Sequence, residues 1–139
     1  MSRRIIVHSL AQAQGALAAA ATLGVPVTLE SAAGAGTYGG PLWFKALIET
    51  AHREHPTVEM EAVLDCAEEA GTALGALRAG IARVRFSGPA ETRRRLSAIA
   101  EALGATLEGE TENEALDLID AHDPEGASRA FLAGNGSPR

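Results

Sequence analysis

Cysteine is nearly absent from this chain of 139 residues. Cys66 is the only one, and a single thiol cannot form an internal disulfide bond. No apolar run approaches the roughly twenty residues that a membrane-spanning helix needs, and the apolar part of the N-terminus is too short for a signal peptide. We therefore expect a protein of the reducing cytoplasm that does not act on a membrane.

Basic residues are also few. The chain has 12 Lys and Arg against 18 Asp and Glu, which gives a formal net charge of -6. This charge disfavours nucleic acid and anionic membranes as partners, so that small molecules and proteins remain. Hydrophobic residues make up 46% of the chain, enough for the core of one soluble domain, and we expect residues 1–139 to fold as a single unit.

Strand-like and helix-like segments alternate along the chain. The strand-like segments are RRIIVHS, VPVTLES, TVEMEAVLD, ARVRFSG and ATLEGE, and a helix-like segment follows each of them. The first helix should end at Gly24 and the second should begin at Pro41. After the fifth strand we expect one helix over residues 113–122 and a shorter one from Asp123. Five such units predict an α/β fold with parallel strands and right-handed crossovers.

Apolar and polar residues alternate within these strands, whereas parallel strands buried on both faces are continuously apolar. If the helices cover the apolar face, the other face carries charges of both signs. We call it the polar sheet face; its members are Arg4, Glu30, Glu59, Glu61, Asp65, Arg83, Arg85 and Glu108. Five strands cannot close a barrel, which takes about eight. We therefore predict a homo-oligomer whose subunits meet through the polar sheet face.

Several segments, taken in order, resemble the N-terminal part of the class II fructose-bisphosphate aldolases, a family of metal-dependent ketose-bisphosphate aldolases. They are SLAQAQGALAAAATLGVPVTLESAAGAGTYGG, PLWFKALIETAHREHP, VLDCAEEAG, ALRAGIARVRFSG, ATLEGE and DPEGASRAF. Together they match about five of the family's eight barrel units. The resemblance implies a truncated, partial (β/α) TIM-type barrel of about five parallel strands with helices on one face.

The same resemblance assigns roles to three residues. Asp65 matches the family's proton-transfer acid, Cys66 stands where the family has a zinc-binding histidine, and Glu108 matches a glutamate near the metal. Ile6 replaces an asparagine that contacts substrate. The family's other two zinc histidines and its main phosphate-binding loops would lie beyond residue 139. The resemblance therefore implies a scaffold without class II aldolase activity.

Two classes of function stay open. We favour a homo-oligomeric binding or structural protein derived from an aldolase. The alternative is an aldolase-like lyase that uses Asp65, Cys66 and Glu108 on a small carbonyl or sugar-phosphate compound. The candidate ligand-binding residues are His8, Glu30, Ser31 and Arg85.

We expect no metal and no other cofactor, because a lone cysteine is more often a small buried hydrophobe than a metal ligand. Asp65 should raise the pKa of the Cys66 thiol and the start of a helix should lower it, so we expect these effects to offset. The glycine-rich loop at residues 32–40 could cradle a phosphate, although a tight loop of the scaffold is the simpler interpretation.

Overall fold

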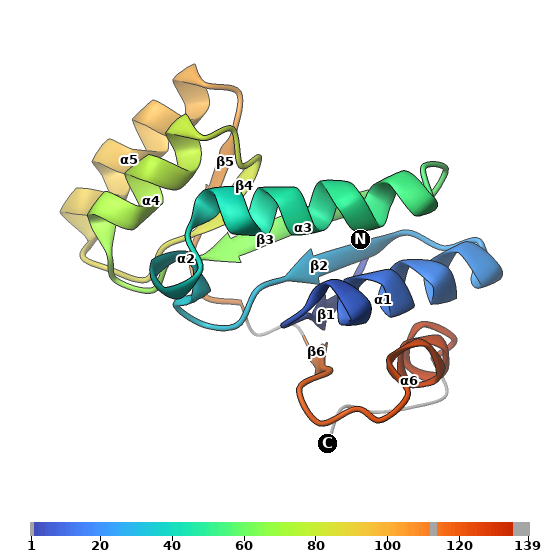
Figure 1. Cartoon of the computed structure of the whole chain (residues 1–139). Coiled ribbons are helices and arrows are strands. Elements are labelled where there is room, and N and C mark those ends of the chain that lie inside the picture. The colour runs from blue at the N-terminus through green and yellow to red at the C-terminus, as the bar shows by residue number, and fades with distance from the viewer. Residues whose placement is uncertain (1, 112–113, 135–139) are drawn as a thin grey trace. The chain divides into compact units, whose positions relative to one another are not determined.

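The computed structural model describes residues 2–111 and 114–134 (Figure 1). The chain divides into two compact units. The first unit comprises residues 1–30, 46–61 and 113–139, and the second comprises residues 31–45 and 62–112. That residues 1–139 form a single domain stays a prediction. No helix among the described residues is long and apolar enough to cross a membrane.

The first unit is built around the central strand β1. Its elements are β1 (Arg3–Ile6), α1 (Leu10–Leu23), β2 (Val27–Glu30), β6 (Ala115–Asp117), α6 (Pro124–Leu132) and the larger part of α3 (Pro41–Glu54). Strand β1 pairs in parallel with β2 on one side and with β6 on the other. Ile5 lies opposite Leu29 and Leu116 in this register, and it is fully buried.

Helix α1 ends where the sequence predicts. Gly24 adopts a left-handed conformation with φ 67° and closes the helix with its backbone N–H, and the Ser9 hydroxyl accepts a hydrogen bond from the N–H of Gln12 at the start. Small side chains let α6 pack closely on α1: a Cβ at Gly15 would lie 2.9 Å from the backbone nitrogen of Glu125. Figure 1 shows α6 beside α1.

The second unit contains the other three strands. Its elements are α2 (Ala35–Tyr38), β3 (Met60–Asp65, of which the first two residues belong to the first unit), α4 (Ala70–Arg78), β4 (Arg83–Arg85), α5 (Ala90–Ala102) and β5 (Thr106–Glu108). Strand β4 pairs in parallel with both β3 and β5. The register sets Arg85 directly between Asp65 and Glu108 at the ends of the three strands.

The predicted α/β class with about five parallel strands is confirmed, and the described residues add one short strand to the five strand-like segments of the sequence. Residues 115–117 form strand β6, where the sequence predicted a helix over residues 113–122. Pairing with β1 overrides the helix propensity of this segment: the N–H of Leu118 donates to the carbonyl of Ile6, and Leu118 is fully buried. Residues 112 and 113 lie outside the described part of the chain.

Candidate functional site

Three charged side chains stand in a row at the carboxyl ends of β3, β4 and β5. The Arg85 guanidinium donates to Oε2 of Glu108 from Nη2 at 2.8 Å and from Nε at 3.2 Å, and its Nη1 lies 3.5 Å from Oδ2 of Asp65. These side chains are 10% (Asp65), 11% (Arg85) and 14% (Glu108) exposed. We call Asp65, Arg85 and Glu108 the Arg85 cluster. Its charges are therefore paired inside the chain and largely withdrawn from solvent.

The second oxygen of Asp65 is held by the backbone. Oδ1 accepts hydrogen bonds from the N–H groups of Gly34, at 3.1 Å, and Ala67, at 2.8 Å. Ala67 has a φ of 49°, which is strained for a residue with a side chain, and the N–H of Ser87 donates to its carbonyl. The carboxylate thus fixes the turn after β3 and the glycine-rich loop. Gly34 belongs to the glycine-rich loop at residues 32–40, for which phosphate binding was the alternative interpretation. Its backbone N–H already donates to Asp65.

Ser31 supports the same turn from β2. Its hydroxyl accepts a hydrogen bond from the N–H of Asp65 at 2.9 Å and donates to the carbonyl of Ala32 at 3.0 Å. The residue is 2% exposed. The hydroxyl oxygen of Ser31 orients the backbone of Asp65, and its single proton is already donated to Ala32. That Ser31 binds a ligand stays a prediction.

Cys66 follows Asp65 but is turned into the protein. It is fully buried, and its Sγ lies so close to Gly36 that a Cβ at that glycine would approach it to 2.8 Å. Burial, with a smaller contribution from Asp65, raises the pKa of the thiol to about 12. The expected offset by a helix is wrong, because α4 begins only at Ala70. At neutral pH the thiol is protonated and a poor nucleophile.

A cavity of about 530 Å³ adjoins the Arg85 cluster within the second unit. Its lining residues are Ala33, Asp65, Ala67, Glu68, Glu69, Arg85, Ser87, Glu110 and Thr111. Four of them are acidic and one is basic, and that one already contacts Asp65 and Glu108. This lining favours a neutral polar molecule over a phosphate ester, because a dianion would meet an excess of negative charge.

Two predicted ligand-binding residues lie in the first unit. Glu30 is 2% exposed and forms an ion pair with Arg4. His8 approaches Asp117 with 2.6 Å between Nε2 and Oδ1. Asp117 was missed because residues 115–117 were assigned to a helix; the alternation of Leu116, Asp117 and Leu118 was the signal for a strand. Both candidates therefore have partners in their own unit.

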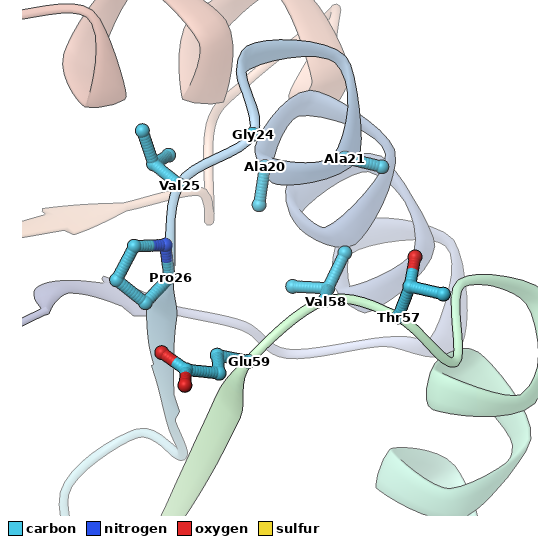
Figure 2. A pocket seen from close by; sticks show the side chains of 8 residues that line it. All are labelled: Ala20, Ala21, Gly24, Val25, Pro26, Thr57, Val58 and Glu59. Carbon is cyan, nitrogen blue, oxygen red and sulfur yellow. The ribbon is translucent and has the colours of Figure 1, made fainter.

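A further pocket lies in the first unit where the chain enters β2 and β3. Figure 2 shows the side chains around it, which come mainly from the end of α1 and the residues before each strand. Its volume is about 330 Å³, and Glu59 is the one ionisable residue in its lining. A single carboxylate among small and aliphatic side chains offers no pair of groups for acid–base catalysis. We assign no site to this pocket.

No protein-family model matches the chain, and no curated protein matches it either. Among solved structures it is similar to one from Coccidioides immitis that is described as a "putative fructose-1,6-biphosphate aldolase". The TM-score is 0.66 at 20% sequence identity, over 78% of this chain and 45% of the other. The chain has an aldolase-like fold. It spans less than half of that neighbour, and the likeness supports the predicted partial TIM-type barrel.

An aldolase-like fold of class II would imply a zinc ion, and the donors in this chain do not fit one. Zinc takes thiolate, imidazole and carboxylate ligands with tetrahedral geometry. Here the Cys66 thiol is buried and protonated, while Asp65 and Glu108 contact Arg85. Among the described residues, no three His, Cys, Asp or Glu side chains gather in a way that could hold a metal ion.

Proposed function

We propose that this chain is an aldolase-derived binding or structural protein without class II aldolase activity. The observation that carries the proposal is the Arg85 cluster. Class II chemistry needs a metal ion with open coordination positions to polarise a carbonyl. The residues that match the family's acid and metal-site glutamate, Asp65 and Glu108, instead contact a guanidinium. The cysteine at the third position is neutral and buried.

An aldolase assay tests this proposal. The purified protein, supplied with zinc and fructose 1,6-bisphosphate, should show no cleavage that a chelator abolishes. The loss of metal polarisation removes several kcal/mol of transition-state stabilisation, and each 1.4 kcal/mol is about tenfold in rate. Asp65→Asn provides the control, because activity that survives this substitution comes from a contaminant. Zinc-dependent cleavage that both the chelator and Asp65→Asn abolish would refute the proposal.

We also propose that the protein is a homo-oligomer that assembles through the polar sheet face and acts in a reducing cytoplasm, where the lone thiol stays reduced. Arg4 and Arg85 have acidic partners in their own chain, so a subunit contact would use more exposed members such as Glu59. Sedimentation should show an oligomer at micromolar concentration. Glu59→Lys should weaken it, whereas Arg94→Glu on the exposed surface of α5 should not.

A monomer at that concentration, or equal effects of the two substitutions, would refute the assembly. Arg85→Glu is a poor probe, because it would set a third carboxylate between Asp65 and Glu108 and damage the monomer itself.

The second candidate function is an enzyme, an aldolase-like lyase, that acts on a small carbonyl or sugar-phosphate compound. The cavity of about 530 Å³ beside Asp65 favours it, since pockets of a few hundred Å³ bind small molecules. A thermal-shift screen with pairs of sugars and their phosphate esters would test it. The acidic lining predicts that the neutral member of each pair stabilises the protein more. Glu68→Gln and Glu110→Gln variants that both respond identically to the wild type would remove the cavity from consideration.

A further inference from the structure

The chain segment that lies over Cys66 has a glycine at each end. It runs from Gly34 to Gly40 and contains the four-residue helix α2. Both glycines adopt the left-handed conformation, with φ 73° at Gly34 and 83° at Gly40. We propose that residues 34–40 form a hinged flap, which opens while the rest of the second unit stays folded, and that solvent reaches Cys66 through this opening. The motion needs neither aldolase chemistry nor an oligomer, so it is independent of the proposed function.

Well-packed residues flank the flap on both sides. Before it, Ser31 is buried and its N–H donates to the carbonyl of Val63 in β3. After it, Phe44 is buried in the first turn of α3. Glycine changes its backbone dihedral angles at little steric cost, and a Cβ at Gly40 would meet nothing within 4 Å. The glycines at the two ends can therefore absorb a rotation that leaves the flanking residues in place.

Few contacts hold the flap closed. None of its residues carries a buried apolar side chain, and Tyr38 is 88% exposed. The N–H of Gly34 donates to Oδ1 of Asp65 at 3.1 Å. The hydroxyl oxygens of Thr37 and Thr72 lie 3.4 Å apart, which is long for a hydrogen bond. Segments with so few buried contacts open at a lower free energy than the elements around them.

Closure places the backbone of the flap directly on the thiol. A Cβ at Gly36 would lie 2.8 Å from Sγ of Cys66 and 3.1 Å from Cγ2 of Thr72. Cys66 is fully buried in this arrangement, so a group added to Sγ must displace part of its cover. The flap is the part of that cover with the fewest contacts. A bond to Sγ and closure of the flap therefore exclude each other, and an adduct would free the N–H of Gly34 from Asp65.

Amide hydrogen exchange of the wild-type chain tests the opening. The N–H groups of Gly34, Thr37 and Gly39 are hydrogen-bonded in the closed flap, whereas the N–H of Phe86 donates to Glu108 in the β4–β5 ladder. A helix of four residues does not persist alone, so all three flap amides lose protection when the flap opens. We expect their opening constants to agree with one another and to exceed that of Phe86 at least about tenfold.

Labelling of Cys66 by iodoacetamide provides the second readout. In this reaction a carbon–sulfur bond replaces the carbon–iodine bond, iodide leaves and the thiol proton passes to solvent. The rate should depend on urea as weakly as exchange of the flap amides does, because opening of the flap exposes little surface. In the labelled protein the N–H of Gly34 should lose its protection, while that of Phe86 keeps it.

Three substitutions separate opening of the flap from unfolding of the unit. Gly36→Ala crowds Sγ and should raise the labelling rate of Cys66 roughly tenfold or more. Leu96→Ala removes a buried side chain from α5 and should leave the rate within about twofold, whereas a route through global unfolding would raise it roughly 30-fold or more. Gly75→Ala meets open space in α4, so it is the control for Gly36→Ala and should not change the rate.

Three results would overturn the inference. The first is exchange of the flap amides no faster than that of Phe86. The second is a labelling rate of wild-type Cys66 that rises with urea as steeply as global unfolding does. The third is a Leu96→Ala variant whose labelling rate rises in proportion to its loss of stability. The first two use the wild-type chain, so they decide the matter even if a variant does not fold. No aldolase assay or sedimentation enters these readouts, which keeps failure of the proposed function distinct from failure of this inference.

Discussion

Thiol reagents should leave Cys66 almost unmodified while the protein is folded. The side chain is fully buried, and burial together with Asp65 raises the pKa of its thiol to about 12. An ordinary cysteine has a pKa of about 8.5, so the thiolate fraction at neutral pH falls on the order of a thousandfold. The thiolate is the species that reacts, so labelling should slow, although by less than this factor because a thiolate of higher pKa is intrinsically more nucleophilic. The loss of access to the buried side chain slows it further.

The assay follows labelling by iodoacetamide at neutral pH with mass spectrometry, in buffer and in concentrated urea. Urea should restore the rate of a free thiol, because the unfolded chain loses both the burial and the fixed neighbour. Opening of the native structure should limit labelling in buffer, so that the rate reports the equilibrium between closed and open forms. Rapid, stoichiometric labelling of the folded chain would refute this reasoning and would restore Cys66 as a candidate nucleophile.

The same pKa predicts how stability depends on pH. A folded-state pKa above the unfolded value means that folding favours the protonated thiol. This contribution is complete below about pH 8.5 and is lost as the pH rises towards the folded-state pKa of about 12. The full difference between about 8.5 and about 12 corresponds to about 5 kcal/mol. Other groups titrate in this range, so the measured quantity is the difference between the wild type and Cys66→Ala. A constant difference between pH 8 and the alkaline limit of folding would contradict the assignment.

Two further predictions concern the free energy of unfolding, which urea denaturation measures. The slope of this free energy against urea concentration is compared between the variants. Asp65→Ala should lower the free energy of unfolding by roughly 3 kcal/mol, since two backbone N–H groups lose a charged acceptor, whereas Asp65→Asn keeps a carbonyl oxygen for them and should cost less. Equal losses would contradict the bonding scheme. Gly36→Ala should cost about 1 to 3 kcal/mol, because its Cβ would lie 2.8 Å from Sγ of Cys66. Gly75→Ala, which meets open space inside α4, should stabilise by about 0.5 to 1 kcal/mol and is the control.

The sequence predicts the strands well because their period is local. The alternation of apolar and polar residues can be read within short stretches of sequence, and so can the signals at Gly24 and Pro41. The structure confirms that the first helix ends before Gly24 and that α3 begins at Pro41. The segment at residues 115–117 shows the limit of this reasoning. It is too short for its pattern to outweigh its helix propensity, and the pairing with β1 that makes it a strand joins segments more than a hundred residues apart.

The candidate site shows the same limit. Alternation predicts that Asp65, Arg85 and Glu108 share a face, but it does not give the register between strands. Register decides whether opposite charges meet within one chain or stay available for a second subunit. The sequence therefore allowed a subunit contact, whereas the structure pairs Arg85 within the chain. The same limit applies to Cys66. Burial is the main cause of the raised pKa of its thiol, and the burial of a side chain cannot be predicted from its neighbours in the sequence.

The pairing of Arg85 with Asp65 and Glu108 also affects which residues at the carboxyl ends of β3, β4 and β5 can recognise a ligand. Asp65 is held by two backbone N–H groups and by Arg85, so a ligand that engaged it would have to displace contacts that the turn after β3 needs. Breaking one member of a buried charged network costs about 3 to 5 kcal/mol, which exceeds what one new hydrogen bond returns. Glu68, Glu69 and Glu110 are exposed at the mouth of the same cavity. Recognition would fall on this rim, with the Arg85 cluster as its rigid floor.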